Sequence, residues 1–153
     1  MTGPHARSGR LGVGIVGAGR VGPVLGAALA AAGHAVVGIA TISDRGKERA
    51  EAMLPGVPVL DVPLVVERSE LVVVAIPAAQ LPEFVAGLAR TDSWQMGQIV
   101  VHTIAEFGID VLAPAVALGA IPLAIHPAMN FTGASIDVSR LAAGKQVVSP
   151  RPV

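Results

Sequence analysis

Six residues close to the N-terminus, Gly17 to Gly22 (GAGRVG), have the spacing G-x-G-x-x-G. An apolar run precedes them and an Ala/Leu-rich stretch follows, so we expect the motif to lie between a strand and a helix. There Gly17 allows a tight turn, Gly19 leaves the backbone open to a diphosphate, and Gly22 lets the helix pack on the strand. The helix N-terminus would offer free N–H groups to the phosphates. The residues predicted to bind a dinucleotide are Gly17, Ala18, Gly19, Arg20, Val21 and Gly22. The alternative is a glycine-rich turn that binds nothing.

The residues after the second apolar run indicate which dinucleotide is preferred. An NAD site carries Asp or Glu about 20 residues after the turn, on the ribose 2′-hydroxyl. Here residues 37–42 (VGIATI) contain no carboxylate, and Ser43 and Arg45 follow. Together with Thr41, the hydroxyl of Ser43 and the guanidinium of Arg45 predict binding of the 2′-phosphate of NADP. NAD is the alternative, because a shifted loop would bring Asp44 to the ribose; Ser43 and Asp44 could also simply cap the next helix.

Two histidines, His102 and His126, end predicted strands, and ligands of open α/β sheets bind at the carboxyl ends of the strands. A histidine can transfer a proton near neutral pH, and Pro127 holds the residue before it extended. We predict that His126 and Thr103 are catalytic and that His102 contacts the cofactor. The alternative is that a histidine at the end of a buried strand only bonds a neighbouring loop.

These side chains need a sheet whose strand ends meet at one edge, and the apolar pattern predicts one. Strands are predicted at residues 11–16, 35–41, 57–60, 71–76, 98–103 and 121–126, with a last one starting at 147–148. Their continuous hydrophobicity indicates burial on both faces. Helices are predicted at residues 21–32, 46–54, 81–90 and 109–118, the last kinked or starting late because of Pro114. This alternation predicts an α/β fold, a doubly wound parallel sheet in three α/β/α layers.

The composition excludes several classes of protein. The 153 residues favour one domain at 11–150, after a disordered tail at 1–10. Lys and Arg (11) balance Asp and Glu (11), so no electrostatic footprint for nucleic acid exists. The absence of Cys excludes disulfides and thiolate sites, and the absence of Tyr excludes a Tyr general acid. No Asp/His spacing suggests a metal site. Arg20 interrupts an apolar stretch that imitates a secretory signal, so we expect no membrane segment and a cytoplasmic protein.

Four stretches together resemble a known family. They are GAGRVG (17–22), LVVVAIP (71–77), VVHT (100–103) and AIHPAMNF (124–131). They are similar to the Rossmann-like proteins with an additional helical domain of uncharacterised function, in the 6-phosphogluconate dehydrogenase-like group. This group includes pyrroline-5-carboxylate reductase, ketopantoate reductase and deazaflavin-dependent NADP oxidoreductases. The resemblance covers about residues 11–150 and implies that Ile76, Pro77 and Ala78 line the cofactor. A small pair such as Ser-Gly usually follows the strand that ends here at Thr103, whereas this chain continues with residues 104–106 (IAE).

The resemblance also implies a function, an oxidoreductase that transfers hydride to or from a small substrate that the sequence does not identify. In that group the substrate lies between the Rossmann domain and a following helical domain. We therefore expect these 153 residues to bind the cofactor without turning over substrate. The helical domain would come from a longer chain or from a partner, and apolar surface left uncovered would favour a homo-oligomer. The alternative is a non-catalytic module that binds a nucleotide as a sensor or scaffold.

Overall fold

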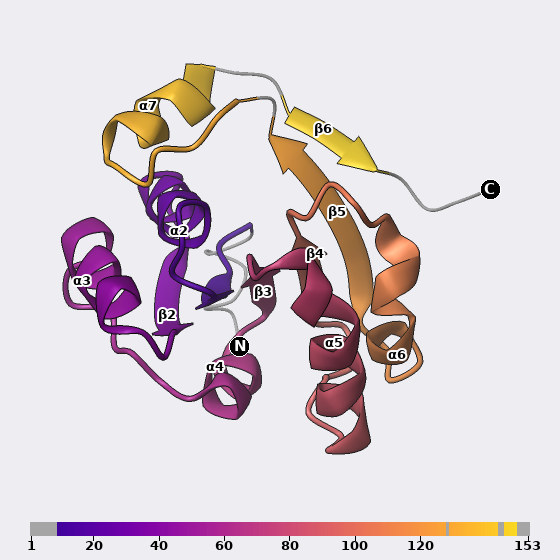
Figure 1. The fold of residues 1–153 in the computed structure, drawn as a ribbon. Helices are drawn as coiled ribbons and strands as arrows, with labels where there is room; N and C mark the ends of the chain where they lie inside the picture. Colours follow the sequence, from indigo (N-terminus) through magenta and orange to yellow (C-terminus); the bar gives the residue numbers. More distant parts are fainter. Residues whose placement is uncertain (1–8, 128, 144–145, 150–153) are drawn as a thin grey trace.

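A six-stranded sheet forms the centre of the molecule, with strand order β2-β1-β3-β4-β5-β6 (Figure 1). The computed structural model describes residues 9–127, 129–143 and 146–149. The strands are β1 (Gly12–Val16), β2 (Ala35–Ala40), β3 (Leu71–Val74), β4 (Ile99–His102), β5 (Ile121–Pro127) and β6 (Gln146–Ser149). The pairs from β2 to β5 are parallel, and β6 pairs antiparallel with β5. The order reverses beside β1, as the predicted doubly wound fold requires.

Helices cover both faces of this sheet, which makes three layers (Figure 1). The α-helices are α2 (Gly22–Ala31), α3 (Asp44–Met53), α4 (Val62–Arg68), α5 (Leu81–Arg90), α6 (Ala113–Val116) and α7 (Ile136–Ala143). Two short 3-10 helices are η1 (Ala78–Gln80) and η2 (Ile109–Leu112). The predicted fold class is therefore confirmed. Within the described residues, no helix has the length and apolar character that crossing a membrane would need.

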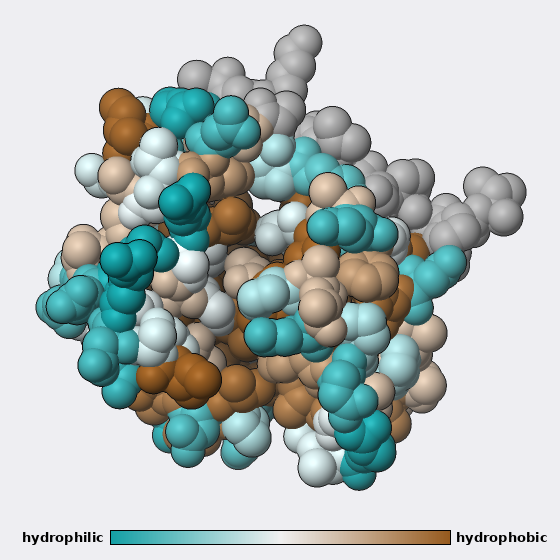
Figure 2. All heavy atoms as spheres, viewed as in Figure 1, coloured by the Kyte–Doolittle hydropathy of each residue, from teal (hydrophilic) through white to brown (hydrophobic). Residues whose placement is uncertain are grey.

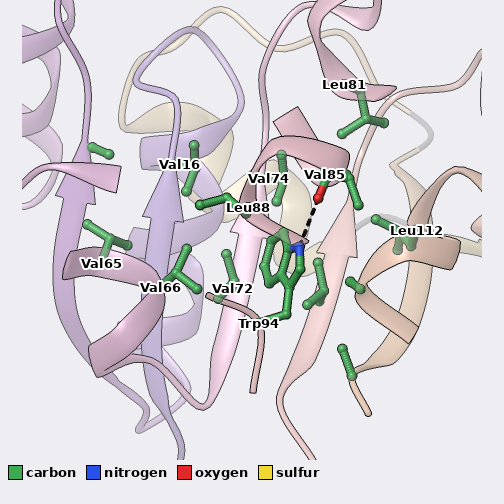
Figure 3. Packing of buried hydrophobic residues seen from close by; sticks show 14 of the residues in the cluster. Val16, Val65, Val66, Val72, Val74, Leu81, Val85, Leu88, Trp94 and Leu112 are labelled. Atoms are coloured by element: carbon green, nitrogen blue, oxygen red, sulfur yellow. Dashed lines mark hydrogen bonds between the residues drawn. The ribbon is translucent and has the colours of Figure 1, made fainter. Parts of the chain in front are cut away.

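Alternate residues along each central strand enter two separate cores. Val72 and Val74 of β3 pack with helices α4 and α5, whereas Val73 packs with residues of α2 and α3. Figure 3 shows the first core, in which the indole N–H of Trp94 donates a hydrogen bond of 3.0 Å to the carbonyl oxygen of Val85. Burial of valines on both faces explains why the strands have continuous rather than alternating hydrophobicity.

Several predicted elements differ in the structure. Residues 57–60 form no strand, only a single bridge between Val59 and Ile39. The predicted helix at 109–118 is divided into η2 and α6, and α6 begins beside Pro114, whose missing N–H is tolerated in a first turn. The sequence pattern predicted neither α4 nor α7. It also did not specify that the last strand runs antiparallel, which the β5–β6 register shows.

The α4 segment, VPLVVER, was missed because valine favours strands and the helix is only 7 residues long. Pro63 lies in its first turn, and Val65 and Val66 are buried against the sheet, so tertiary packing outweighs the local preference. The predicted disordered tail falls mainly on residues 1–8, which lie outside the described residues, as does position 150, the predicted end of the domain.

Candidate functional site

The glycine-rich turn joins β1 to α2, and its glycines meet different surroundings. Gly17 has a φ of 102°, and a Cβ there would lie 2.2 Å from the carbonyl oxygen of Ala75. A Cβ at Gly22 would lie 2.1 Å from the carbonyl oxygen of Gly17, so neither position can carry a side chain without a backbone shift. A Cβ at Gly19 would meet nothing within 4 Å. The turn is therefore tight where the chain folds back and open where a ligand could approach, as the motif predicted.

The first turn of α2 is left without a side-chain cap, so it can bind an anion. Val21 occupies the N-cap position and makes no side-chain hydrogen bond, and Pro23 follows within the first turn. The first helical bond runs from the N–H of Leu25 to the carbonyl oxygen of Val21 (3.0 Å). Earlier N–H groups of a helix have no acceptor inside it, and they carry the positive end of its dipole. This end of α2 lies directly after the open position at Gly19.

A cleft of about 280 Å³ lies beside this turn. Its lining comes from three segments: Arg20 and Val21 of the turn, Ala75, Ile76 and Ala78 after β3, and Thr103, Ile104, Ala105 and Glu106 after β4. These segments meet because β1, β3 and β4 are adjacent and parallel, so that their carboxyl ends share one edge. Figure 2 shows the surface hollowed between the parts that cover α2 and α5.

Five of the predicted site residues line this cleft together: Arg20, Val21, Ile76, Ala78 and Thr103. Pro77 is not part of the lining; it occupies the N-cap position of η1, immediately before Ala78. Ala18 is buried, and its carbonyl oxygen is directed towards α3, where it accepts a hydrogen bond of 3.4 Å from Arg49.

The predicted 2′-phosphate residues lie at the start of α3, beyond the end of β2. The Ser43 hydroxyl accepts a hydrogen bond of 2.9 Å from the N–H of Gly46, so the capping alternative is confirmed for Ser43. Its hydroxyl proton is left free to donate. Thr41 packs on the same glycine, because a Cβ at Gly46 would lie 2.1 Å from the Thr41 hydroxyl. The Arg45 side chain is exposed and takes part in neither ion pair of the described residues.

Arg49 is a candidate site residue that the sequence pattern did not predict. It lies one helical turn after Arg45 on α3, and its guanidinium reaches the carbonyl oxygen of Ala18 in the glycine-rich turn. A Cβ at Gly133 would lie 3.3 Å from Nε of Arg49 and 3.4 Å from Cα of Arg20. The spacing of four residues from Arg45 was the available signal, since residues i and i+4 share a helix face.

The side chain of His102 is bonded within the chain and lies outside the lining of the cleft, and its predicted contact with the cofactor stays a prediction. The residue is fully buried at the end of β4, and both ring nitrogens are already bonded within the chain. Nδ1 accepts a hydrogen bond of 3.0 Å from the N–H of Ile104, and Nε2 is 2.8 Å from the carbonyl oxygen of Gly108. Burial is the largest influence and lowers the pKa of His102; the Gly108 bond opposes it, and the charge of His126 lowers it further. The alternative reading, a histidine bonded to a neighbouring loop, is the one observed.

His126 lies on β5, next to His102 but outside the lining of the cleft. The two rings are 6.4 Å apart between centroids, with 60° between their planes. Nδ1 of His126 is buried and has no hydrogen-bond partner among the described residues. Thr103 lines the cleft and His126 does not, so the structure does not bring the two predicted catalytic residues together in its lining.

Asp137 holds together the segment that leads into α7, and Gly133 of this segment lies beside Arg20 of the glycine-rich turn. One oxygen of this buried carboxylate accepts hydrogen bonds from the N–H groups of Thr132 (2.7 Å) and Gly133 (2.8 Å) and from the Thr132 hydroxyl (3.0 Å). Arg140 donates to the other oxygen at 3.1 Å. Burial by itself would raise the pKa of Asp137, but these hydrogen bonds and the charge of Arg140 outweigh it and lower the pKa.

Comparison with known proteins agrees with this fold. The sequence model of the Rossmann-like domain family matches residues 1–127. No curated protein matches the sequence. Among solved structures, 3-hydroxyisobutyrate dehydrogenase of Mycobacterium tuberculosis, solved with L-serine, is 19% identical with a TM-score of 0.66, covering 83% of this chain and 44% of its own.

Two further solved structures are similar. A variant imine reductase of Myxococcus stipitatus in complex with NAD+ is 19% identical, with a TM-score of 0.62, covering 79% of this chain and 42% of its own. A semialdehyde dehydrogenase NAD-binding protein of Cupriavidus necator, in complex with calcium and NAD, is 18% identical, with a TM-score of 0.61. The match covers 91% of this chain and 51% of that protein. These are dehydrogenases and reductases, the classes that the sequence resemblance implied. The chain spans about half the length of these structures, and the likeness shows a shared fold.

Proposed function

Because this chain belongs to the Rossmann-like domain family, we propose that it binds NADP(H) as the dinucleotide-binding part of an oxidoreductase that acts on a small molecule. The observation that carries the proposal is the glycine-rich turn, in which Gly17 and Gly22 are too crowded for a side chain and Gly19 is open. A diphosphate fits over Gly19, against the uncapped first turn of α2. NADPH, when bound, supplies the hydride.

The cleft would hold the nicotinamide half of the dinucleotide. Ile76 and Ala78 provide apolar walls that exclude water, and Arg20 provides a positive charge beside the phosphates. Thr103 offers a hydroxyl inside the cleft and is the candidate for orienting the substrate or the nicotinamide amide. In a complete site His126 is the candidate proton donor, although reaching the substrate requires its ring to face the cleft.

The adenosine half would extend along the edge of the sheet towards the start of α3. There the exposed Arg45 guanidinium and the Ser43 hydroxyl are the groups proposed to bind the 2′-phosphate. Arg49 adds a second guanidinium on the same helix, next to the glycine-rich turn. NAD, which is named with two of the structural neighbours, is the alternative cofactor.

The proposal predicts that the chain binds NADPH more tightly than NADH. A charge-assisted hydrogen bond contributes roughly 1.5–3 kcal/mol, so Arg45→Ala should weaken NADPH by about 10- to 100-fold and leave NADH nearly unchanged. The measurement is calorimetric titration of both cofactors. Arg68→Ala is the matched control, because Arg68 is exposed at the end of α4, near the start of β1 and so at the opposite edge of the sheet.

Two outcomes of these titrations test the preference for NADP and the binding of a dinucleotide separately. Equal losses for NADPH and NADH in Arg45→Ala would reject the NADP assignment while keeping the dinucleotide site. If wild-type protein binds neither cofactor, the proposed function is wrong.

A further inference from the structure

One wall of the cleft is an irregular loop that follows β4. Its residues Ile104, Ala105 and Glu106 line the cleft, and η2 begins at Ile109. Within the loop a single backbone hydrogen bond is formed, from the N–H of Phe107 to the carbonyl oxygen of Ile104 (3.1 Å). A loop with so few bonds of its own needs other groups to hold its position.

The ring of His102 supplies two bonds, one at each end of this loop. Nδ1 meets the N–H of Ile104, which can only donate, and Nε2 meets the carbonyl oxygen of Gly108, which can only accept. The two bonds form together only in the neutral ring that carries its proton on Nε2. Full burial of the ring favours this neutral form and leaves no water to replace either bond.

We infer that His102 is a positioning residue that holds the Ile104–Glu106 wall of the cofactor cleft in place, acting through the backbone of the loop and without touching the cofactor. The inference rests on the proposed function for the identity of the ligand, NADPH. It gives a role to a buried histidine outside the lining of the cleft, and it explains why a polar ring lies in the core at a strand end.

Three substitutions of His102 remove its two hydrogen bonds singly or together. The side-chain oxygen of Asn can occupy the place of Nδ1, so His102→Asn should keep the Ile104 bond and lose the Gly108 bond. The side-chain nitrogen of Gln can occupy the place of Nε2, so His102→Gln should do the reverse. His102→Phe fills the space and loses both. We expect NADPH dissociation constants to rise by about threefold to tenfold in Asn and Gln and by more than about tenfold in Phe.

The matched control is Trp94→Phe. It also removes one buried hydrogen bond, to the carbonyl oxygen of Val85, but Trp94 precedes β4, at the end of that strand opposite His102. It should lower the melting temperature and leave NADPH affinity unchanged. A loss of affinity in the control equal to that of the His102 variants would attribute the effect to general destabilisation and overturn the inference.

Two readouts need no cofactor, so they remain decisive if NADPH is not the ligand. Nitrogen-15 chemical shifts should show an unprotonated Nδ1 and a protonated Nε2 in His102 at neutral pH. The amide of Ile104 should be protected from hydrogen exchange in wild type and in His102→Asn, and should lose protection by at least tenfold in His102→Gln. Protection unchanged in all variants, or a proton found on Nδ1, would overturn the inference whether or not NADPH binds.

Discussion

Three glycines of one turn differ in what a side chain would meet, and this difference separates folding from binding. At Gly22 a Cβ would collide with a backbone oxygen at 2.1 Å, whereas at Gly19 it would project into open space. Gly22 therefore serves the packing of α2 on β1, and Gly19 is available to a ligand. The G-x-G-x-x-G motif predicts this division, and the surroundings of the three glycines agree with it.

We predict that Gly19→Val folds as the wild type does but no longer gains thermal stability from NADPH. The valine would occupy the space proposed for the diphosphate, and ligand at 100 times its dissociation constant stabilises a protein by about 2.7 kcal/mol. The measurement is the melting temperature with and without NADPH. Gly22→Ala is the comparison variant, which should melt lower even without ligand. A normal rise with NADPH in Gly19→Val would show that no phosphate lies over this turn.

At the scale of an element, α7 depends on a carboxylate in its own first turn. Asp137 accepts three hydrogen bonds from Thr132 and Gly133, so the helix and the segment that leads into it are joined through one side chain. The same segment lies against Arg20 and Arg49, because a Cβ at Gly133 would lie within 3.4 Å of both residues. Ionised Asp137 therefore holds a segment that borders the proposed phosphate site.

The lowered pKa of Asp137 makes part of the stability depend on pH. A carboxyl whose pKa is lower folded than unfolded stabilises the protein above its unfolded pKa, about 3.9 for Asp, and loses this contribution as pH falls through the folded pKa. Asp137→Asn should therefore melt below wild type at pH 7, and the difference should shrink towards pH 3. Calorimetric melting from pH 7 to 3 measures this.

The control for the acid scan is Glu67→Gln, which removes an exposed carboxylate of α4. It should follow the wild-type profile within a small constant offset. If the gap between wild type and Asp137→Asn stays the same at every pH, the carboxylate is not the source of the acid sensitivity.

At the scale of the whole molecule, the cleft is built from one edge of one sheet. All of its lining comes from the segments after β1, β3 and β4. Hydride transfer needs the substrate held against the nicotinamide with water excluded, and such positioning supplies roughly 7–11 kcal/mol of a barrier. Nothing in this lining provides an opposite wall. Large apolar side chains are also exposed at Ile42 (97%), Met96 (87%) and Ile136 (60%), which keeps self-association as a prediction.

We therefore predict that the 153-residue chain binds NADPH but does not oxidise it with pyrroline-5-carboxylate, ketopantoate or small oxo-acids. The measurement follows NADPH absorbance with the isolated chain, whose cofactor binding is verified in the same preparation. Steady oxidation that disappears in His126→Ala would contradict this prediction and make His126 the proton donor of a complete site.

Features that depend on neighbours along the chain could be predicted from the sequence. Helix α5 has the predicted bounds, and the strands at residues 12–16, 71–74 and 99–102 lie inside the predicted apolar runs. The glycine-rich turn could be predicted for the same reason. A tight turn between a buried strand and a helix requires glycines at set places within six consecutive residues. The sequence by itself therefore determined the fold class, and it predicted the edge of the sheet at which the candidate site lies.

Features that depend on the atoms surrounding a side chain were decided only by the tertiary structure. The valines of α4 form a helix because the sheet buries two of them. His102 is a bonded core residue because the loop after β4 turns back over it, although its position at a strand end was equally consistent with a cofactor contact. Arg49 reaches the glycine-rich turn 31 positions away along the chain. Such contacts join groups whose separation in sequence carries no periodic signal, so only the folded chain defines them.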